Sequence, residues 1–237
     1  MRWAQLTDRG LVRSLNEDSL CVSPEIGLFA VADGMGGHLA GEVASATALQ
    51  MLEQDLSKRL QNGEFPQHAL VNAVQGANRK IFELAGSNQQ WAGMGTTLTA
   101  CLKREEVIYI AQVGDSRAYL LRESRIVQLT EDHSLVRELV KNGELTEEQA
   151  LQHPQRNVLT RALGTAPSLT VDLYLHKVGP GDLLLLCTDG LTGYLRPEEI
   201  LFTVRTSPDL DTAVRVLVDK ALGAGGKDNI TVILLEM

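Results

Sequence analysis

The sequence contains few cysteines, and their placement excludes two kinds of site. Only Cys21, Cys101 and Cys187 occur among 237 residues. They stand far apart, and no C-x-x-C pair exists for a zinc site or a dithiol redox centre. Each lies in or beside an apolar strand pattern. We therefore expect three reduced thiols in or near the hydrophobic core.

Long apolar runs are also missing. The first residues, Met1 to Asp8, reach polar and acidic side chains too early to form the apolar region of a signal peptide. No later run approaches the length of about 20 apolar residues that a membrane-spanning helix needs. These absences predict a cytoplasmic protein that does not associate with a membrane.

The sequence has no basic cluster. Its formal net charge is −8, from 22 basic and 30 acidic side chains. Such a chain offers no surface for nucleic acid or for an anionic membrane. No Pro/Gly/Ser-rich linker, internal repeat or heptad pattern is present either. We therefore predict a single domain over residues 1–237 and a monomer.

The chain does contain alternating strand and helix patterns. Apolar residues recur at helical spacing in two neighbouring segments, 42–60 and 66–85, which predicts two amphipathic helices covering one face of a sheet. Strand patterns surround this pair, and further helix patterns follow. The expected strands are 4–7, 19–23, 28–32, 96–102, 106–113, 117–121, 183–187 and 231–235, and the further helices are 197–203 and 209–222.

These elements predict a layered fold. Short connections between strands favour antiparallel pairing. Strand runs separated by paired helices indicate fold class α+β, an α/β/β/α sandwich of two antiparallel sheets flanked by helix pairs. The polar segment 131–155, with short helical patterns at 134–141 and 146–152, does not fit a sheet. We predict that it forms a mobile flap.

Five short acidic segments stand at the edges of predicted strands. Singly, each is typical of a turn, because Asp bonds its own backbone and Gly or Asn tolerates positive φ. In an antiparallel sheet, however, one strand ends beside the start of its neighbour, so the segments can meet at one end. Grouped carboxylates repel one another unless a hard cation such as Mg²⁺ or Mn²⁺ neutralises them. The segments are Asn16-Glu17-Asp18, Ala32-Asp33-Gly34, Gly114-Asp115-Ser116, Thr188-Asp189-Gly190 and Lys227-Asp228-Asn229.

In this order and spacing the segments resemble the motifs of the metal-dependent PPM (PP2C-like) serine/threonine protein phosphatases, in their compact bacterial form. The resemblance covers nearly the whole chain, and five motifs in order are far more specific than one. It implies hydrolysis of phosphoserine and phosphothreonine in proteins, so the expected partners are phosphorylated proteins. The matching motifs are residues 13–18 (RSLNED), 31–37 (VADGMGG), 113–117 (VGDSR), 186–191 (LCTDGL) and 226–232 (GKDNITV).

The resemblance also implies a ligand set for two Mg²⁺ or Mn²⁺ ions. Asp33 would bridge the ions, with the carbonyl of Gly34 on one ion and Asp189 and Asp228 on the other. A water between two such ions loses a proton near neutral pH, and the hydroxide then attacks phosphorus in line with the ester bond.

Four further side chains are expected near these ions. By the resemblance, Asp18 with Glu17 behind it forms an outer shell that orients bound waters. Arg13 is the expected phosphate ligand, because its planar guanidinium can make two parallel hydrogen bonds, although it could instead solvate a turn. Asp115 would join Asp189 at a third, weaker ion, with an ordinary turn bond as the alternative.

The proton donor for the leaving alkoxide is less clearly marked. Eukaryotic relatives place a histidine where this chain has Met35, and the nearest candidate is His38, as in many bacterial members. His38 could equally cap the helix beginning near Gly41. The other histidines stand in polar or loop contexts and are expected at the surface: His68, His133, His153 and His176.

Two other functions compete with this interpretation. The segment 34–37 (GMGG) resembles the start of a dinucleotide-binding loop, but Leu39 replaces the third glycine and Asp33 would face the pyrophosphate. A non-catalytic, metal-stabilised phosphoprotein-binding module would be marked by the loss of a metal ligand. No ligand is missing, which favours the enzyme.

Overall fold

The computed structural model describes residues 1–36 and 40–237. The strands of this part form two antiparallel sheets, which we name sheet A and sheet B. The strands are β1 (Trp3–Asp8), β2 (Asp18–Ser23), β3 (Leu28–Met35), β4 (Gly95–Thr96), β5 (Leu98–Arg104), β6 (Val107–Val113), β7 (Arg117–Arg122), β8 (Arg125–Gln128), β9 (Asp172–Lys177), β10 (Leu183–Cys187) and β11 (Ile230–Glu236). Sheet A has the order β1-β11-β10-β7-β8, and sheet B has the order β2-β3-β5-β6-β9 with β4 beside β3.

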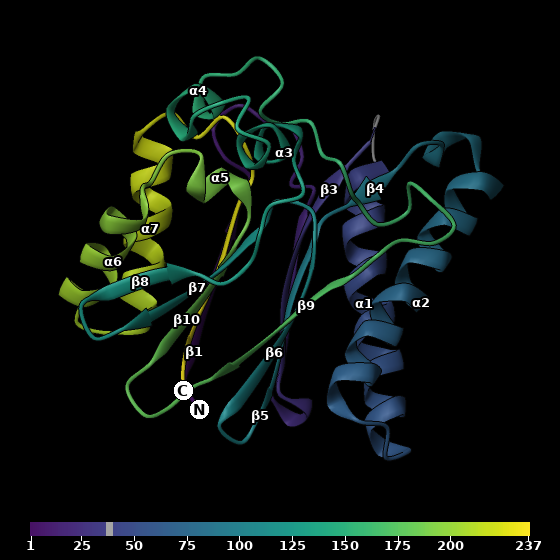
Figure 1. Cartoon of the computed structure of the whole chain (residues 1–237), viewed down its shortest axis with the longest axis horizontal. Helices are drawn as coiled ribbons and strands as arrows, with labels where there is room; N and C mark the ends of the chain where they lie inside the picture. Colours follow the sequence, from purple (N-terminus) through teal and green to yellow (C-terminus); the bar gives the residue numbers. More distant parts are fainter. Residues whose placement is uncertain (37–39) are drawn as a thin grey trace.

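The helices cover the outer faces of the two sheets (Figure 1). Helices α1 and α2 lie on sheet B, and α6 and α7 lie on sheet A. The helices are α1 (Ala40–Gln61), α2 (Pro66–Ser87), α3 (Leu135–Lys141), α4 (Glu147–Leu151), α5 (Asp189–Thr192), α6 (Pro197–Thr206) and α7 (Leu210–Gly223). No helix in the described ranges is both long and apolar enough to cross a membrane.

Strand β10 shows why the layers form. Successive side chains of a strand point to opposite faces. Leu183, Leu185 and Cys187 therefore pack with α7, whereas Leu184 and Leu186 pack between the sheets. Strand β3 alternates in the same way between α1 and the space between the sheets. The predicted α/β/β/α sandwich of the α+β class is confirmed.

The N-terminal half of α1 packs closely on sheet B because its buried side chains are small. Ala40, Ala44 and Ala48 recur every four residues along one face and are at most 1% exposed. The hydroxyl of Ser45 lies 2.8 Å from that of Ser19 on β2. This close approach holds the N-terminal half of α1 against the start of β2 and the end of β3.

The antiparallel register brings distant acidic segments to one end of the sandwich. Asp18 on β2 pairs directly with Asp33 on β3. Cys187, which ends β10, pairs with Val232 near the start of β11. The two chain termini lie at the opposite end (Figure 1). The candidate site is therefore built where several strands of both sheets begin or end.

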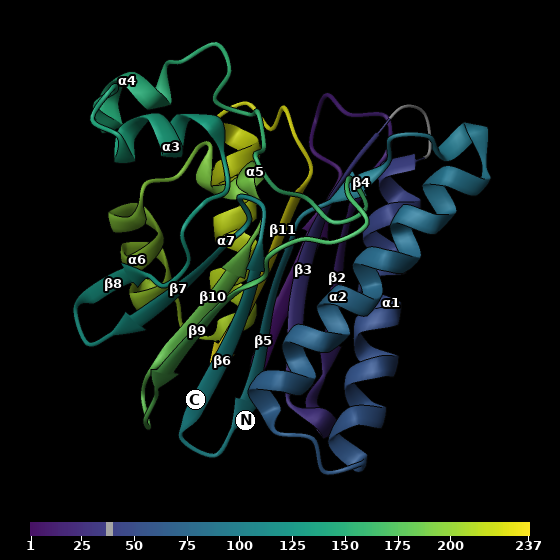
Figure 2. The ribbon, with the colours of Figure 1, turned by 45° about the vertical axis from the view of Figure 1, so that its right-hand side comes forward.

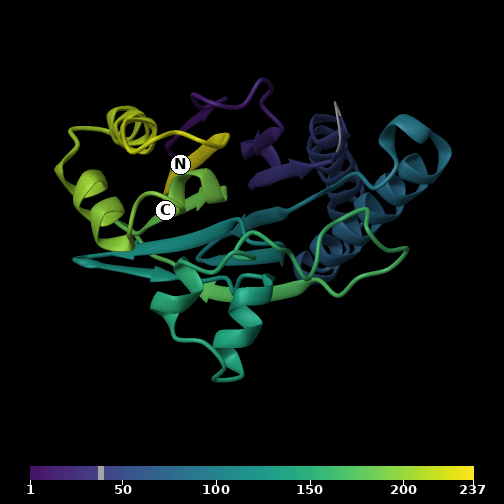
Figure 3. The same cartoon turned by 90° about the horizontal axis from the view of Figure 1, so that it is seen from above.

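The segment 131–155 projects from this end of the sandwich beside the edge strands of both sheets (Figures 2 and 3). It carries α3 and α4, close to the two predicted helical pieces. Its mobility stays a prediction. The missed elements include β8 and β9, which form sheet edges with several exposed side chains, and α5, a single turn that follows β10.

Candidate metal centre

Aspartates from four distant segments line one cavity of about 200 Å³. They are Asp33, Asp115, Asp189 and Asp228. The same cavity is lined by Arg13, Glu17 and Gly34, and by Asn157 and Leu159 beyond the flap. A larger cavity of about 930 Å³ under the flap shares Asp115, Asn157 and Asp189. The acidic group thus opens towards the flap.

Asp18 lies behind this cavity and is only 7% exposed. Its Oδ2 atom accepts hydrogen bonds from Thr188 Oγ1 at 2.8 Å and Thr231 Oγ1 at 2.7 Å. Its Oδ1 atom is buried and has no partner within the described part of the protein. The two threonines fix the carboxylate so that one oxygen stays available to a ligand or water.

Gly34 occupies a position where only glycine fits. A Cβ at this residue would collide with the carbonyl oxygen of Gly41 and lie 2.6 Å from that of Glu17. The Gly34 amide donates to the same Glu17 oxygen at 3.0 Å. Strand β3 and the first turn of α1 can therefore approach closely beside the Glu17 carboxylate, whose Oε1 is buried without a partner in the described ranges.

The turn carrying Asp115 is held from two sides. Gly114 has φ +100°, and a Cβ there would lie 2.6 Å from the side chain of Thr97. The Thr97 and Ser116 hydroxyls are 2.7 Å apart on one side. On the other side, the Gly114 amide donates to His133 Nδ1 at 3.1 Å, and the His133 amide donates to the Gly114 carbonyl at 2.9 Å.

The prediction that His133 lies at the surface was wrong. Its side chain is 4% exposed, and Nε2 lies 3.1 Å from Asp172 Oδ2. Because Nδ1 accepts from Gly114, the ring carries its proton on Nε2 and donates to Asp172. Burial lowers the pKa of His133, against the opposing effect of Asp172. The prediction failed because the residues next to His133 in the sequence are polar, which gave no sign that its imidazole supports the Asp115 turn.

Burial and mutual repulsion raise the pKa values of the clustered carboxyls. Burial is the largest cause in each case, followed at Asp33 by the charges of Asp18 and Asp189. The pKa of Asp18 rises to about 7 and that of Asp115 to about 8. The pKa values of Asp33 and Asp189 are also raised. The group favours protons, or other cations, over bare negative charge.

The donor chemistry fits hard divalent cations. Asp18 Oδ1, Glu17 Oε1 and Asp189 Oδ1 are buried without hydrogen-bond partners among the described residues. Carboxylate and carbonyl oxygens suit Mg²⁺ or Mn²⁺ better than zinc. Within the described ranges, however, no three His, Cys, Asp or Glu side chains are already arranged around one ion position. Asp228 Oδ2 is instead paired with Arg13.

Arg13 reaches the acidic group from the loop between β1 and β2. Its Nη2 lies 2.9 Å from Asp228 Oδ2, and half of the side chain is exposed. The hydrogen bond to Asp228 is the largest cause of the raised pKa of Arg13, and burial opposes it. The negative charges of Glu17 and Asp33 raise the pKa further. A guanidinium at the cavity rim can bind an anion there.

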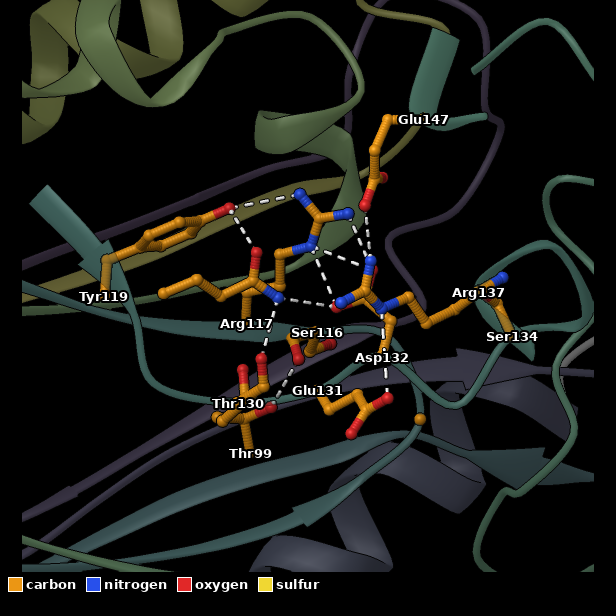
Figure 4. Close-up of polar contacts among 12 residues, drawn as sticks. Thr99, Ser116, Arg117, Tyr119, Thr130, Glu131, Asp132, Ser134, Arg137 and Glu147 are labelled. Atoms are coloured by element: carbon orange, nitrogen blue, oxygen red, sulfur yellow. Dashed lines mark hydrogen bonds and ion pairs between the residues drawn. The ribbon is translucent and has the colours of Figure 1, made fainter. Parts of the chain in front are cut away.

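A polar network fastens the base of the flap beside the site (Figure 4). Arg117 Nε and Nη2 donate to Asp132 at distances of 2.6–3.0 Å, and Nη1 donates to Tyr119 Oη at 3.1 Å. Arg137 on α3 lies 2.7 Å from Glu147 on α4. The sequence did not predict the pairing of Arg117 with Asp132, although an arginine directly after the Asp115 turn was a visible signal.

His38 lies outside the described residues, so its predicted roles as proton donor or helix cap have no structural outcome. The remaining predicted site residues lie at or behind one cavity, as described above. Their individual roles stay predictions.

Comparison with known proteins decides the family. The sequence profile described as "Protein phosphatase 2C" matches residues 12–224. The chain belongs to the protein phosphatase 2C family. It is 41% identical to the serine/threonine phosphatase stp of Listeria innocua over 97% of this chain and 93% of that protein.

Solved structures agree with this family. The crystal structure of the Mycobacterium tuberculosis serine/threonine phosphatase PstP/Ppp superposes with a TM-score of 0.92 at 38% identity, covering 100% of this chain and 98% of that one. A structure of the PstP catalytic domain in complex with two manganese ions has a TM-score of 0.87 at 36% identity, covering 99% and 97%. A two-metal Mn²⁺ or Mg²⁺ site is thus supported for this protein phosphatase 2C fold.

Proposed function

We propose that this chain hydrolyses phosphoserine and phosphothreonine in proteins, with Mg²⁺ or Mn²⁺ as cofactor. The observation that carries the proposal is the convergence of four aspartates and one arginine on a single small cavity. The raised pKa values of Asp18, Asp33, Asp115 and Asp189 support cation binding there. The family and its phosphatase relatives favour this enzyme over a non-catalytic phosphoprotein-binding module.

The proposed ligand set follows the cavity lining. Asp33 would bridge two ions, with the Gly34 carbonyl on one and Asp189 and Asp228 on the other. When bound, such ions would activate water as a nucleophile and neutralise charge on the phosphoryl group. Asp228 would exchange its contact with Arg13 for a metal ion. A divalent ion would neutralise the Asp228 carboxylate more strongly than the singly charged guanidinium, which would leave Arg13 available for phosphate.

Arg13 is proposed to bind the phosphate of the substrate. The guanidinium stands at the cavity rim, half exposed, and makes its contact with Asp228 through Nη2. A planar fork can hold two phosphate oxygens in parallel, which orients the ester bond relative to the carboxylate group. His38 is proposed as the donor that protonates the leaving alkoxide.

Asp18 and Glu17 are proposed to orient bound waters. Both carry a buried carboxyl oxygen without a partner in the described part of the chain. Fixed outer oxygens of this kind hold first-shell groups in place. A third, weaker ion is proposed at Asp115 and Asp189, where the two cavities share both side chains.

Phosphorylated proteins are the proposed partners, and nucleic acids and membranes are not. The net charge of −8 supports this choice, because polyanions would be repelled. A cytoplasmic location and a monomeric state are part of the same proposal.

A metal-dependent assay tests the proposed function. Hydrolysis of p-nitrophenyl phosphate should require Mn²⁺ or Mg²⁺, stop in EDTA and return when Mn²⁺ is restored. Activity that is indifferent to EDTA, or Mn²⁺ binding without turnover, would refute the enzyme assignment and favour the binding-only alternative.

A further inference from the structure

The side chain of Asn229 forms three hydrogen bonds with one distant loop. The residue directly follows Asp228 and is 4% exposed. Its Oδ1 accepts from the Glu17 amide at 2.8 Å. Its Nδ2 donates to the carbonyls of Arg9 at 2.8 Å and Leu15 at 2.9 Å. One carboxamide therefore ties both ends of the loop 9–17 to the start of β11.

This contact depends on an amide specifically. Glu17 presents an N–H group, whereas Arg9 and Leu15 present carbonyl oxygens. A group with one acceptor and two donors satisfies all three, as only Asn or Gln can. Because the atoms match in only one orientation, the amide also fixes the path of the loop. Substitution by alanine would leave three backbone groups without their partner.

The loop held in this way carries Arg13. It connects β1 to β2 and has no regular secondary structure of its own between Arg9 and Glu17. Two backbone contacts supplement Asn229. Leu11 N donates to Gly226 O at 2.7 Å, and Gly10, with φ +77°, leaves no room for a Cβ against the Asp228 carbonyl. Figure 2 shows the purple loop beside the yellow turn that precedes β11.

We propose that Asn229 is a positioning residue for phosphate binding. It keeps the loop 9–17 on the turn that carries Asp228, so that Arg13 is held at the cavity rim before substrate arrives. Without it, the loop would have to become ordered when the phosphate binds, which weakens binding. The inference rests on the proposed function, in which Arg13 contacts the phosphate.

Asn229→Ala is expected to raise KM more than it lowers kcat. We expect KM for a phosphothreonine peptide to rise about tenfold, the usual effect of losing roughly 1.4 kcal/mol of binding. Mn²⁺ affinity should change less than twofold, because the Asn229 backbone amide, which donates to Asp228 Oδ1 at 2.9 Å, survives the substitution. The KM and kcat values are measured at saturating Mn²⁺.

A double-mutant cycle separates positioning from general damage. If Asn229 acts through Arg13, then Asn229→Ala should change kcat/KM less than twofold in an Arg13→Ala background. Asn78→Ala is the matched control. Asn78 is 1% exposed and ties α2 to another loop, accepting from Gly164 N at 2.8 Å and donating to Ala166 O at 3.0 Å. Asn78→Ala should lower the melting temperature of the protein without raising KM.

Hydrogen exchange gives a readout that does not need activity. In metal-free protein, Asn229→Ala should speed hydrogen exchange at the amides of residues 9–17 and leave the exchange rates of α7 unchanged. If the alanine variant does not fold, Asn229→Ser is used for the same measurements. The positioning role would be overturned if Asn229→Ala lowered kcat/KM by the same factor in the wild type and in the Arg13→Ala background. Unchanged hydrogen exchange in the loop 9–17 would overturn it as well. Absence of Mn²⁺-dependent turnover in the wild type would instead refute the proposed function, and the exchange experiment would still test the hold of Asn229 on the loop.

Discussion

Arg13 Nη2 lies 2.9 Å from Asp228 Oδ2, across 215 residues of sequence. The contact joins the proposed phosphate ligand to a proposed metal ligand. Each partner is at least 30% exposed, so the pair itself adds little to stability. Its importance lies in placing a side chain that would bind phosphate next to one that would bind a metal ion, before any substrate is present.

Arg13→Ala should raise KM much more than it weakens metal binding. A charge-assisted hydrogen bond contributes about 1.5–3 kcal/mol, which corresponds to a rise of roughly 10- to 100-fold. Arg13→Lys keeps the charge but loses the planar fork, and we expect an intermediate KM. Steady-state kinetics with a phosphopeptide and Mn²⁺ titration calorimetry check both variants. A KM equal to that of wild type would show that Arg13 only solvates the turn.

Asp115→Ala should spare two strongly bound ions and depress turnover. Asp115 lies between the two cavities, where the third ion is proposed. We expect kcat to fall about 10- to 100-fold, the range typical of substitutions that remove a supporting group from a metal site. Calorimetry should still count two Mn²⁺ ions per chain. Full activity in this variant would remove the third ion from the account.

Metal-free protein should lose stability as the pH rises from about 4 to about 8. The pKa values of Asp18 (about 7) and Asp115 (about 8) exceed the value of about 3.9 in an unfolded chain. The native state therefore binds more protons than the unfolded state in this window, so its free energy of unfolding falls with pH. Saturating Mn²⁺ should reverse the trend because it binds the ionised carboxyls.

Urea unfolding in EDTA at pH 5 and pH 8 measures this dependence. Asp18→Asn should reduce the slope, since the amide cannot ionise. A metal-free protein that is equally stable at both pH values would contradict the electrostatic description of the site.

Arg117→Ala should loosen the base of the flap. The Arg117 and Asp132 side chains are 29% and 11% exposed, and breaking a pair of this kind costs about 2–3 kcal/mol when one charge stays buried. We expect a lower free energy of unfolding, lower kcat and faster tryptic cleavage after Lys141. The matched control is Arg122→Ala, at the other end of β7.

Arg122 pairs with Asp182 at 2.7 Å and is 52% exposed. The Asp182 carboxylate is only 6% exposed, so Arg122→Ala should lower the free energy of unfolding by an amount similar to that of Arg117→Ala. It should leave both kcat and flap cleavage unchanged, because the pair lies far from the flap. Equal changes in kcat and in flap cleavage for the two variants would mean that Arg117 acts only through general stability.

The layered fold could be predicted because alternation within strands and helical spacing record which faces are buried. Leu184 and Leu185 show this directly, since neighbouring leucines enter different cores. Strand β8 was missed because its four residues, Arg125 to Gln128, include three exposed ones. An edge strand without a buried face leaves no periodic signal.

The candidate site was visible as motifs, but its supporting contacts were not. Sequence spacing cannot show that His133 braces the Gly114 turn, because that contact depends on how the flap returns to sheet B. The same holds for Asn229, whose amide meets a loop more than 200 residues away. Motifs record the chemistry, whereas tertiary packing decides which polar side chains position it.

The most direct test is a Mn²⁺-dependent phosphopeptide assay on the wild type and on Asp189→Ala in parallel. The wild type should release phosphate only with the metal present, and Asp189→Ala should bind fewer ions and lose at least about 100-fold in kcat. Undiminished turnover in Asp189→Ala, or turnover by the wild type in EDTA, would contradict the claim that these carboxylates hold the catalytic ions.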